Sequence, residues 1–177
     1  VASREGSRGL SSSTRGVFIG GSSNNVIEFV TIASQGNSID YGDASANSEG
    51  YGNHAYSNSV RGVYSLGAVP SSSNVIEFFD IEAGGTAADF GDLTQARQQV
   101  AGASEANGGL NDGYQGSRNT YIQGSGRTLN LGGQADADRI GFFNVNTLGN
   151  ESDFGSLAGN QEAGGSLSSS TRALIGG

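Results

Sequence analysis

The stretch RGVFIGGSSNNVIEFVTIASQGNSIDYGD, residues 15–43, decides the fold, because three phrases within it return in the same order further along the chain. The first phrase, RGVFIGG, returns as RGVYSLG at 61–67, as RNTYIQG at 118–124 and as RALIGG at 172–177. The second phrase, NVIEF at 25–29, returns at 74–78 and as DRIGF at 138–142. The third, SIDYGD ending at Asp43, returns as AADFGD ending at Asp92 and as ESDFGS ending at Ser156. The chain is therefore an array of repeated units.

The spacing of the second phrase gives the size of one unit. It recurs after 49 residues, from Asn25 to Asn74, and then after 64 residues, from Asn74 to Asp138. Periods of roughly 20 to 50 residues indicate solenoids, propellers or arrays, and the longer second step indicates an insertion. We predict one repeat array with units at about 1–47, 48–96 and 97–160 and a partial unit at about 161–177.

The composition favours an ordered β-protein. Only 34% of the residues are hydrophobic and 31 are Gly, but the net charge is just −8 and the apolar residues gather in strand-length runs. All nine basic residues are Arg, and the acidic excess opposes binding to a phosphate backbone. No apolar run is long enough to cross a bilayer. We expect no nucleic-acid partner, no membrane insertion and no cofactor; the absence of Cys excludes disulfides and thiolate chemistry.

The two ends of the sequence indicate a processed piece or a fragment. The chain begins at Val1, contains no Met and shows no secretory leader. At the other end, SLSSSTRALIGG at 166–177 restates GLSSSTRGVFIGG at 9–21. Because an open sheet edge aggregates unless it is covered, we expect the strand Thr171–Ile175 to pair with another chain, with further sequence or with the strand near Arg4–Ser13.

Each unit reads as four short antiparallel strands. In the first unit the β-branched and aromatic runs, separated by turn residues, predict strands at about 6–13, 15–19, 26–32 and 38–41. The pair Gly20 and Gly21 predicts the tight turn between the second and third of them. Helix is expected to be minor: the best candidate is Leu93–Val100, for which a polar link between units is an equal alternative.

Four strands repeated in this way predict the blades of a β-propeller, three complete and a partial fourth. The sequence also resembles the kelch repeat. The resemblance lies in a hydrophobic strand ending in Gly-Gly, an aliphatic-acidic-aromatic strand, a short strand with an aromatic near its end, and a linker that contains Arg97. It is one of architecture, because Gln123 and the pair Ser65–Leu66 interrupt the Gly-Gly pattern. The usual Trp of the family is replaced by Tyr41, Phe90 and Phe154.

The sequence also resembles tandem repeats in predicted virion proteins of tailed phages that infect marine cyanobacteria. The resemblance is carried by the segments SSSTRGVFIGG, NVIEFVTIASQGNSIDYGD and AADFGDLTQAR. The resemblance covers most of the chain outside 103–137. It implies a tail fibre or another surface component of the virion, located outside the cell. The partners implied are other virion or appendage proteins, a homo-oligomer or adjoining chain that completes the propeller, and a host-surface glycan.

Repeated charges suggest a structural ion pair. Four arginines open the copies of the first phrase: Arg15, Arg61, Arg118 and Arg172. If the hairpin pairs symmetrically, Arg15 lies near Glu28 and Arg61 near Glu77, and we prefer this ion pair in each blade to a ligand-binding ring of arginines. In the third unit Gly141 stands where the other units have Glu, so Arg118 should find another acceptor or be exposed.

The aspartates of the third phrase recur as Asp40 and Asp43, then as Asp89 and Asp92, and finally as Asp153. They could bind Ca²⁺, but neither their spacing nor their number resembles a calcium-binding loop. We favour aspartates that cap a tight turn through their own side chains, and we expect no metal site.

Recognition is expected in the irregular segments. The single His54 has no second His or Cys to form a metal site, and no spacing places it in a catalytic triad. The insertion of the third unit is polar and Gly-rich, and loops on a rigid scaffold often carry recognition. The candidates for glycan or partner contact are Tyr51, Tyr56, Tyr114, Arg118 and Arg127; the alternative is a tolerated surface insertion.

Together these patterns predict a non-enzymatic structural and binding module of a phage virion appendage, with no catalytic residues. One alternative is a subunit of a bacterial extracellular filament or a secreted adhesive propeller. Another is a glycan-processing enzyme on a propeller scaffold, for which the sequence singles out no pair of carboxylates.

Overall fold

The structure, a computed structural model, describes residues 4–48, 54–58, 60–67, 71–104, 126–168 and 172–177, in which it contains fourteen strands and no helix. The strands form three four-stranded antiparallel sheets and one two-stranded sheet, and in each sheet the strands follow one another in sequence order. We call the three larger sheets blades 1, 2 and 3, and the small one the half-blade.

Blade 1 consists of β1 (Arg8–Ser11), β2 (Arg15–Ile19), β3 (Asn24–Thr31) and β4 (Ile39–Ser48). Blade 2 consists of β5 (Ala55–Ser57), β6 (Arg61–Ser65), β7 (Ser73–Asp80) and β8 (Ala88–Arg97). Blade 3 consists of β9 (Ala101–Ser104), β10 (Arg127–Leu131), β11 (Arg139–Asn144) and β12 (Ser152–Ser156). The half-blade consists of β13 (Gly165–Ser168) and β14 (Ala173–Gly176). The predicted all-β fold of four-stranded blades with a partial fourth is confirmed.

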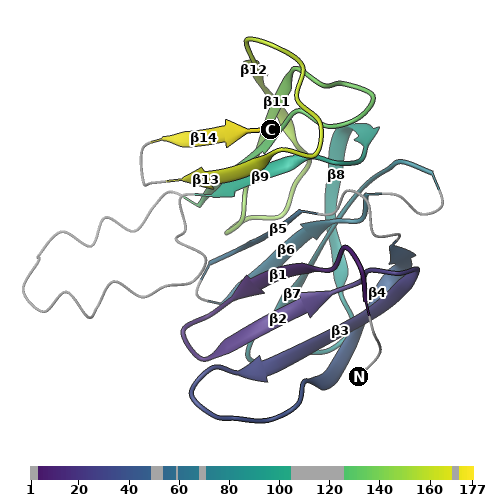
Figure 1. Ribbon diagram of the computed structural model, residues 1–177, viewed down its shortest axis with the longest axis vertical. Helices are drawn as coiled ribbons and strands as arrows, with labels where there is room; N and C mark the ends of the chain where they lie inside the picture. Colours follow the sequence, from purple (N-terminus) through teal and green to yellow (C-terminus); the bar gives the residue numbers. More distant parts are fainter. Residues whose placement is uncertain (1–3, 49–53, 59, 68–70, 105–125, 169–171) are drawn as a thin grey trace, which may run out of the picture.

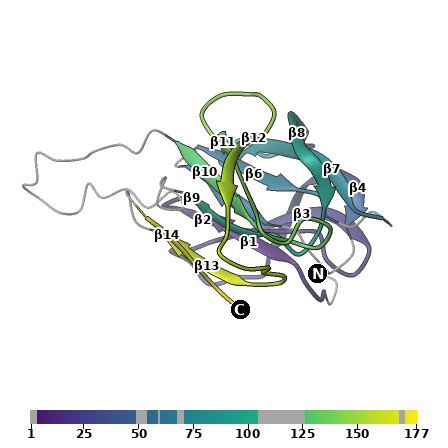
Figure 2. The ribbon, with the colours of Figure 1, turned by 90° about the horizontal axis from the view of Figure 1, so that it is seen from above.

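The sheets follow one another in an open row along the long axis of the molecule (Figure 1). The first strands are the neighbours that join them: β1 contacts β5, β5 contacts β9, and β9 contacts β13. The fourth strands lie on the other side of the row, where β8 and β12 also touch. Seen from above, β13 and β14 lie on the same side of the molecule as β1 (Figure 2).

The hydrophobic core lies between successive sheets. Val17 and Ile27 of blade 1 pack with Tyr64 and Phe79 of blade 2 in one buried cluster. A second cluster joins blades 2 and 3, and a third joins blade 3 to the half-blade. Because side chains alternate between the two faces of a strand, an inner blade must present apolar residues on both faces, and this explains why its strands read as nearly continuous apolar runs.

The glycine pair forms the predicted turn between the second and third strands. Gly20 and Gly21 have φ values of 59° and 92°, in the region that favours glycine. In blade 3 the equivalent turn is made by Gly132 and Gly133, with φ values of 64° and 106°. These follow β10, so the third copy of the first phrase is RTLNLGG at 127–133. Our assignment of RNTYIQG at 118–124 to this place was wrong, and that segment lies outside the described residues.

The predicted helical candidate is also wrong. Leu93 to Arg97 are the end of β8, where Arg97 pairs with Ser73 of β7. Leu93 is 3% exposed and belongs to the core between blades 2 and 3. Packing between sheets therefore overrides the local helix propensity of this segment.

Candidate functional site

The first strands of the four sheets line one groove of about 420 Å³. Each strand contributes three consecutive residues: Gly9–Ser11, Ala55–Ser57, Gly102–Ser104 and Ser166–Ser168. None of these twelve residues carries an acidic, basic or thiol group. They can therefore hold a neutral molecule through hydroxyl and backbone groups; the one phenol among them, that of Tyr56, is buried.

A serine occupies the same place in all four first strands. Ser57 donates a hydrogen bond through its hydroxyl to the carbonyl of Ser11 (3.0 Å), and Ser168 donates in the same way to the carbonyl of Ser104 (2.6 Å). Each of these bonds joins one sheet to the sheet before it. The serines thus hold the wall of the groove together.

Tyr56, a predicted contact residue, lines this groove but is only 3% exposed. Its ring packs edge-to-face on Phe143, with centroids 5.5 Å apart, and its hydroxyl donates to Asn130. Burial, and then the charge of Glu151, raise the pKa of Tyr56 above its usual value. The ring of Tyr56 is buried because the alternation of β5 turns it into the core between blades 2 and 3, so Tyr56 is not the exposed aromatic that the sequence suggested; its contact with a glycan stays a prediction.

The other predicted contact residues are placed only in part. Three of them lie outside the described residues: Tyr51, Tyr114 and Arg118. Arg127 is exposed at the start of β10, and its guanidinium carbon lies 5.6 Å from the ring centroid of Phe142. Since it opens β10 as Arg15 opens β2, Arg127 is the repeat arginine of blade 3, a position that we had predicted for Arg118.

The predicted ion pair between Arg15 and Glu28 does not form. Arg15 stands opposite Thr31 and Phe18 opposite Glu28, and positions three apart on one strand point to opposite faces of the sheet. Arg15 instead reaches blade 2, where its guanidinium lies 3.5 Å from the carboxylate of Glu82. It also donates to the carbonyls of Ile81 and Glu82.

Blade 2 repeats this arrangement, so the predicted pairing of Arg61 with Glu77 was also wrong. Arg61 stands opposite Asp80, three positions from Glu77, and it donates to the carbonyl of Val145 in blade 3 (3.0 Å). Glu77 is buried on the other face, where it accepts from the hydroxyl of Tyr64 and the backbone N–H of Ser45. Arg15 and Arg61 therefore reach forward to the next blade, and Glu77 reaches back to the one before.

Two arginines that we did not single out for an ion pair hold the carboxylates of blades 1 and 3. Arg4 lies 3.1 Å from Glu28, and Arg97 pairs with Glu151, with both side chains of the second pair fully buried. Each arginine also donates to the carbonyl of the first glycine of the adjacent turn, Gly20 for Arg4 and Gly132 for Arg97. Both stand four residues before the first strand of the blade they bind, a spacing that the sequence shows.

Glu151 replaces the glutamate that blade 3 lacks. Gly141 occupies the position of Glu28 and Glu77, and a Cβ built on it would lie 2.0 Å from a carboxylate oxygen of Glu151. That carboxylate accepts from the backbone N–H of Thr94 (2.9 Å), as Glu77 accepts from the backbone of Ser45. A carboxylate therefore still lies between the blades, but it comes from the residue just before β12 and not from β11.

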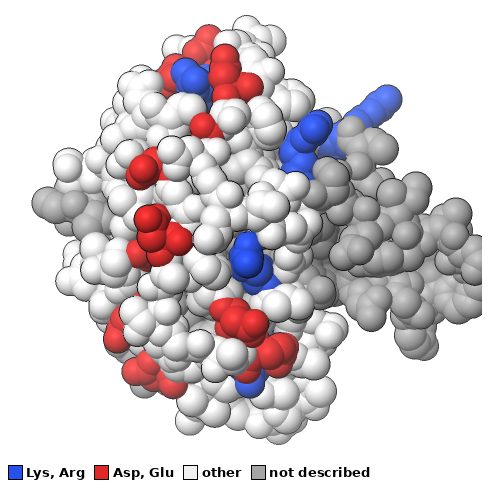
Figure 3. Space-filling model, turned by 180° about the vertical axis from the view of Figure 1, so that it is seen from behind, with Lys and Arg blue, Asp and Glu red and all other residues white. Residues whose placement is uncertain are grey.

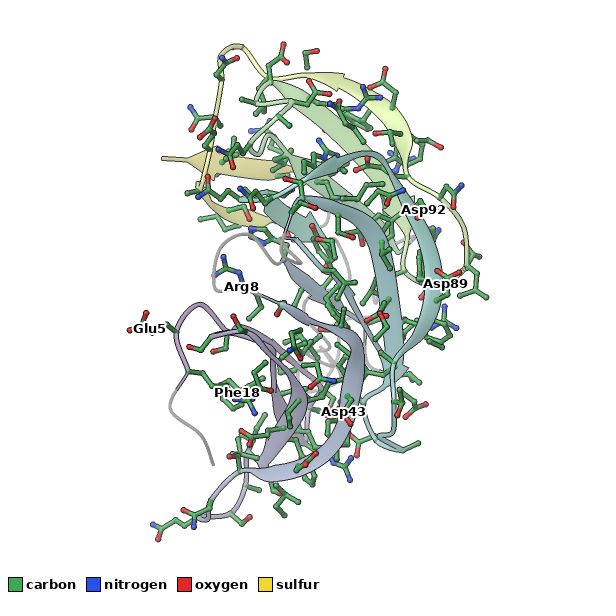
Figure 4. The ribbon with its side chains drawn as sticks, turned by 90° about the vertical axis from the view of Figure 1, so that its right-hand side faces the viewer. Glu5, Arg8, Phe18, Asp43, Asp89 and Asp92 are labelled. Atoms are coloured by element: carbon green, nitrogen blue, oxygen red, sulfur yellow. The ribbon has the colours of Figure 1, made fainter. Side chains whose placement is uncertain are left out.

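The aspartates of the third phrase lie at the outer edge, where Asp89 and Asp92 are seen on the opposite side of the molecule from Glu5 (Figure 4). Asp40 accepts from the N–H of Gly42 (3.3 Å) and so caps its turn through its own side chain. Asp43 is exposed, and its backbone carbonyl accepts from Ala87 of blade 2 (2.9 Å). The phrase joins neighbouring blades through its backbone.

The glycine in this phrase is required by the same contact. A Cβ on Gly42 would lie 2.0 Å from the carbonyl oxygen of Gly85, and a Cβ on Gly91 would lie 2.5 Å from that of Gly149. No real Cβ approaches so closely. Gly recurs between an aromatic residue and Asp because the fourth strand of one blade approaches the next blade too closely for a side chain.

The single histidine and the described carboxylates show how the titratable groups are arranged. Burial, and then the charge of Arg8, lower the pKa of His54 to about 4, so this imidazole is neutral at pH 7. In the described ranges no three Asp, Glu or His side chains are grouped to hold a metal ion. Acidic side chains are spread along the face seen in Figure 3. No helix long and apolar enough to cross a bilayer occurs in the part of the chain that the structure describes.

No model of a known protein family matches this chain, and the search of curated proteins found no match.

Proposed function

We propose that this chain is a non-enzymatic structural and binding module of a phage virion appendage, a tail fibre or surface decoration, whose groove holds a neutral glycan of the host surface. The observation that carries the proposal is where the ionisable side chains lie. Two of the three buried carboxylates, Glu77 and Glu151, connect successive blades, and the third, Glu28, pairs with Arg4 at the start of blade 1, whereas the twelve residues of the groove carry no charge.

A neutral sugar fits the groove better than a charged ligand does. The lining combines serine hydroxyls and backbone groups with Leu167, which is 65% exposed. Sugar recognition uses both kinds of surface, because hydroxyls exchange hydrogen bonds while the faces of the ring pack on apolar groups. The assignment to an appendage is suggested by the resemblance of the repeat sequence to the kelch pattern and to tandem repeats of phage virion proteins.

Particle purification tests the location. We expect this chain to co-purify with capsid proteins through a density gradient and to be identified there by mass spectrometry. Its abundance in phage-free bacterial culture would contradict the virion proposal and favour a bacterial filament or secreted adhesin.

A glycan array tests the groove. Gly9 lies on the groove and is exposed, and a Cβ added there meets only the carbonyl of Val17 at 3.7 Å. The variant Gly9→Leu should therefore fold and obstruct the groove. Gly159→Leu is the matched control, since nothing lies within 4 Å of its Cβ. We expect neutral glycans to bind the unaltered chain and the control but not Gly9→Leu; equal binding by all three would remove the groove from the proposal.

A further inference from the structure

The half-blade has an open edge at β14. Its sequence RALIGG restates RGVFIGG, and β14 pairs with β13 as β2 pairs with β1. In blades 1, 2 and 3 the second strand pairs on both sides, with a first and a third strand. In the described residues β14 pairs with β13 only. The backbone groups along its other side are available to one further antiparallel strand.

The aromatic side of blade 3 is open next to this edge. Phe154 of β12 packs on Phe142 with ring centroids 6.0 Å apart, and it is 51% exposed. Phe90 holds the same place in blade 2 and packs on Phe78 in the same way, but it is 3% exposed. The difference is the next blade, because Phe143 of blade 3 covers Phe90 at a centroid distance of 5.3 Å.

The glycine of the third phrase marks the second missing strand. Gly42 and Gly91 each face a carbonyl in the segment that precedes the fourth strand of the next blade. Gly155 stands at the same place in blade 3 and has a φ of 146°, like the 148° of Gly91, but nothing lies within 4 Å of its Cβ position. The backbone of β12 is therefore shaped for an approach that no described residue makes.

We propose that β14 and the open side of blade 3 form an acceptor slot for a β-hairpin of this repeat's own third-and-fourth-strand type. The internal junctions define the occupant. Its first strand carries the aliphatic-acidic-aromatic pattern of NVIEF and pairs with β14; its second strand carries the aromatic-Gly-Asp pattern and lies against Gly155. The slot follows from the junction between blades 2 and 3 and is independent of the virion and glycan assignments.

The acidic residue of the incoming strand has a defined destination. Between blades 1 and 2 the carboxylate of Glu77 accepts from the backbone N–H of Ser45, three residues after Gly42. Between blades 2 and 3 the carboxylate of Glu151 accepts from Thr94, three residues after Gly91. Ala158 lies three residues after Gly155 and is exposed. The incoming carboxylate is directed to this backbone amide.

A peptide-binding experiment tests the slot. The probe is a fluorescent peptide of residues 22–48, which contains the third and fourth strands of blade 1, and its binding to the full chain is followed by fluorescence anisotropy. The blocking variant is Phe154→Asp, which places a charge on the open aromatic side. The matched control is Leu148→Asp, since Leu148 is 59% exposed in the turn before β12. A second probe carries Glu28→Ala and requires no change in the chain.

We expect saturable binding with one peptide per chain, unchanged by Leu148→Asp and lost in Phe154→Asp. The Glu28→Ala peptide should bind about tenfold more weakly, as expected for the loss of one charge-assisted hydrogen bond. The absence of saturable binding to the unaltered chain would overturn the proposal, as would equal binding to both variants. Failure of glycan or particle association would leave these results unaffected.

Discussion

At the scale of single residues, the ion pair between Arg97 and Glu151 stabilises the junction between blades 2 and 3. Both side chains are fully buried, and Asn130 and Thr94 donate to the same carboxylate. Buried ions remain in a protein when their partners satisfy them, and removing one partner leaves an uncompensated charge. The contribution of Glu151 therefore far exceeds that of an exposed pair.

Glu151→Ala should lower the free energy of unfolding by about 3–5 kcal/mol, because it leaves Arg97 buried without its counter-ion. Urea denaturation followed by circular dichroism measures this. Asp153→Ala is the control: Asp153 is 67% exposed and 3.7 Å from Arg139, so its loss should cost about 0–1 kcal/mol. Equal losses in the two variants would show that the buried pair is not what joins the blades.

Gly141 and Glu151 should behave as an exchangeable pair. Gly141→Glu alone forces a side chain into the space of Glu151 and sets two carboxylates together, so we expect a loss of several kcal/mol, about 3 or more. Adding Glu151→Ser recreates the arrangement of Glu28 with Ser38, which donates to it at 3.2 Å.

The double variant should therefore recover at least about 1 kcal/mol relative to Gly141→Glu alone, a coupling within the usual range for contacting residues. Urea titrations of the two single variants and the double variant measure it. Strictly additive losses would contradict the exchange.

His54 gives the stability a defined pH dependence. Because burial lowers its folded pKa to about 4 from 6.5, the unfolded chain binds the proton more readily. The contribution of neutral, buried His54 to the free energy of unfolding is complete above about pH 6.5 and is lost as the pH falls toward 4. We expect a loss on the order of 2 kcal/mol across this window, measured as the difference in unfolding free energy between the unaltered chain and His54→Asn at pH 7 and pH 4.5. A difference that does not change with pH would contradict the assignment.

At the scale of the elements, the outer strands meet the next blade through a glycine, and two glycines provide a matched comparison. Gly91 and Gly155 share a φ near 147°, so replacement by Ala strains both backbones similarly. Only at Gly91 would the added Cβ meet a carbonyl oxygen, that of Gly149 at 2.5 Å.

Gly91→Ala should therefore destabilise the chain by about 1–3 kcal/mol more than Gly155→Ala, the usual cost of overpacking. Thermal unfolding by calorimetry measures the two side by side. If the two variants unfold alike, the outer strands do not meet as the structure shows.

The strands were predictable where periodicity and turn residues agree, and this holds best for β2, whose bounds Arg15–Ile19 match the prediction. The third blade was misaligned because RNTYIQG, like the first phrase, carries an aromatic residue followed by Ile, whereas RTLNLGG carries Asn and Leu at these positions. The turn depends on the glycine pair, which RTLNLGG retains at Gly132 and Gly133. Aligning the units on the glycine pair that the turn requires, and not on the other residues of the phrase, would have located β10.

The site was predictable only in part, because it depends on which face of a strand each side chain occupies. Arg15 and Glu28 were paired by proximity, whereas the register sets them on opposite faces. Tyr56 was predicted to contact a glycan or partner because its sequence neighbours are polar, but its ring is buried in the core between blades 2 and 3. The exchange of Gly141 for Glu151 could be found only after the strands were aligned in space.

At the scale of the whole molecule, the sheets stand in sequence order with their first strands side by side. This arrangement creates the groove and the acceptor slot, since both are bounded by more than one sheet. It also explains why the same phrases recur: each copy makes the same two contacts, one with the preceding sheet and one with the following sheet.

Paired cysteines test this claim most directly, because the chain contains no Cys of its own. Ser57 and Ser168 donate to the carbonyls of Ser11 and Ser104, so the pairs Ser11→Cys with Ser57→Cys and Ser104→Cys with Ser168→Cys should form disulfides under mild oxidation. The pair Ser11→Cys with Ser104→Cys skips a sheet and should remain reduced. Mass measurement after thiol alkylation reads all three; rapid oxidation of the skipping pair, or none in the adjacent pairs, would contradict the arrangement.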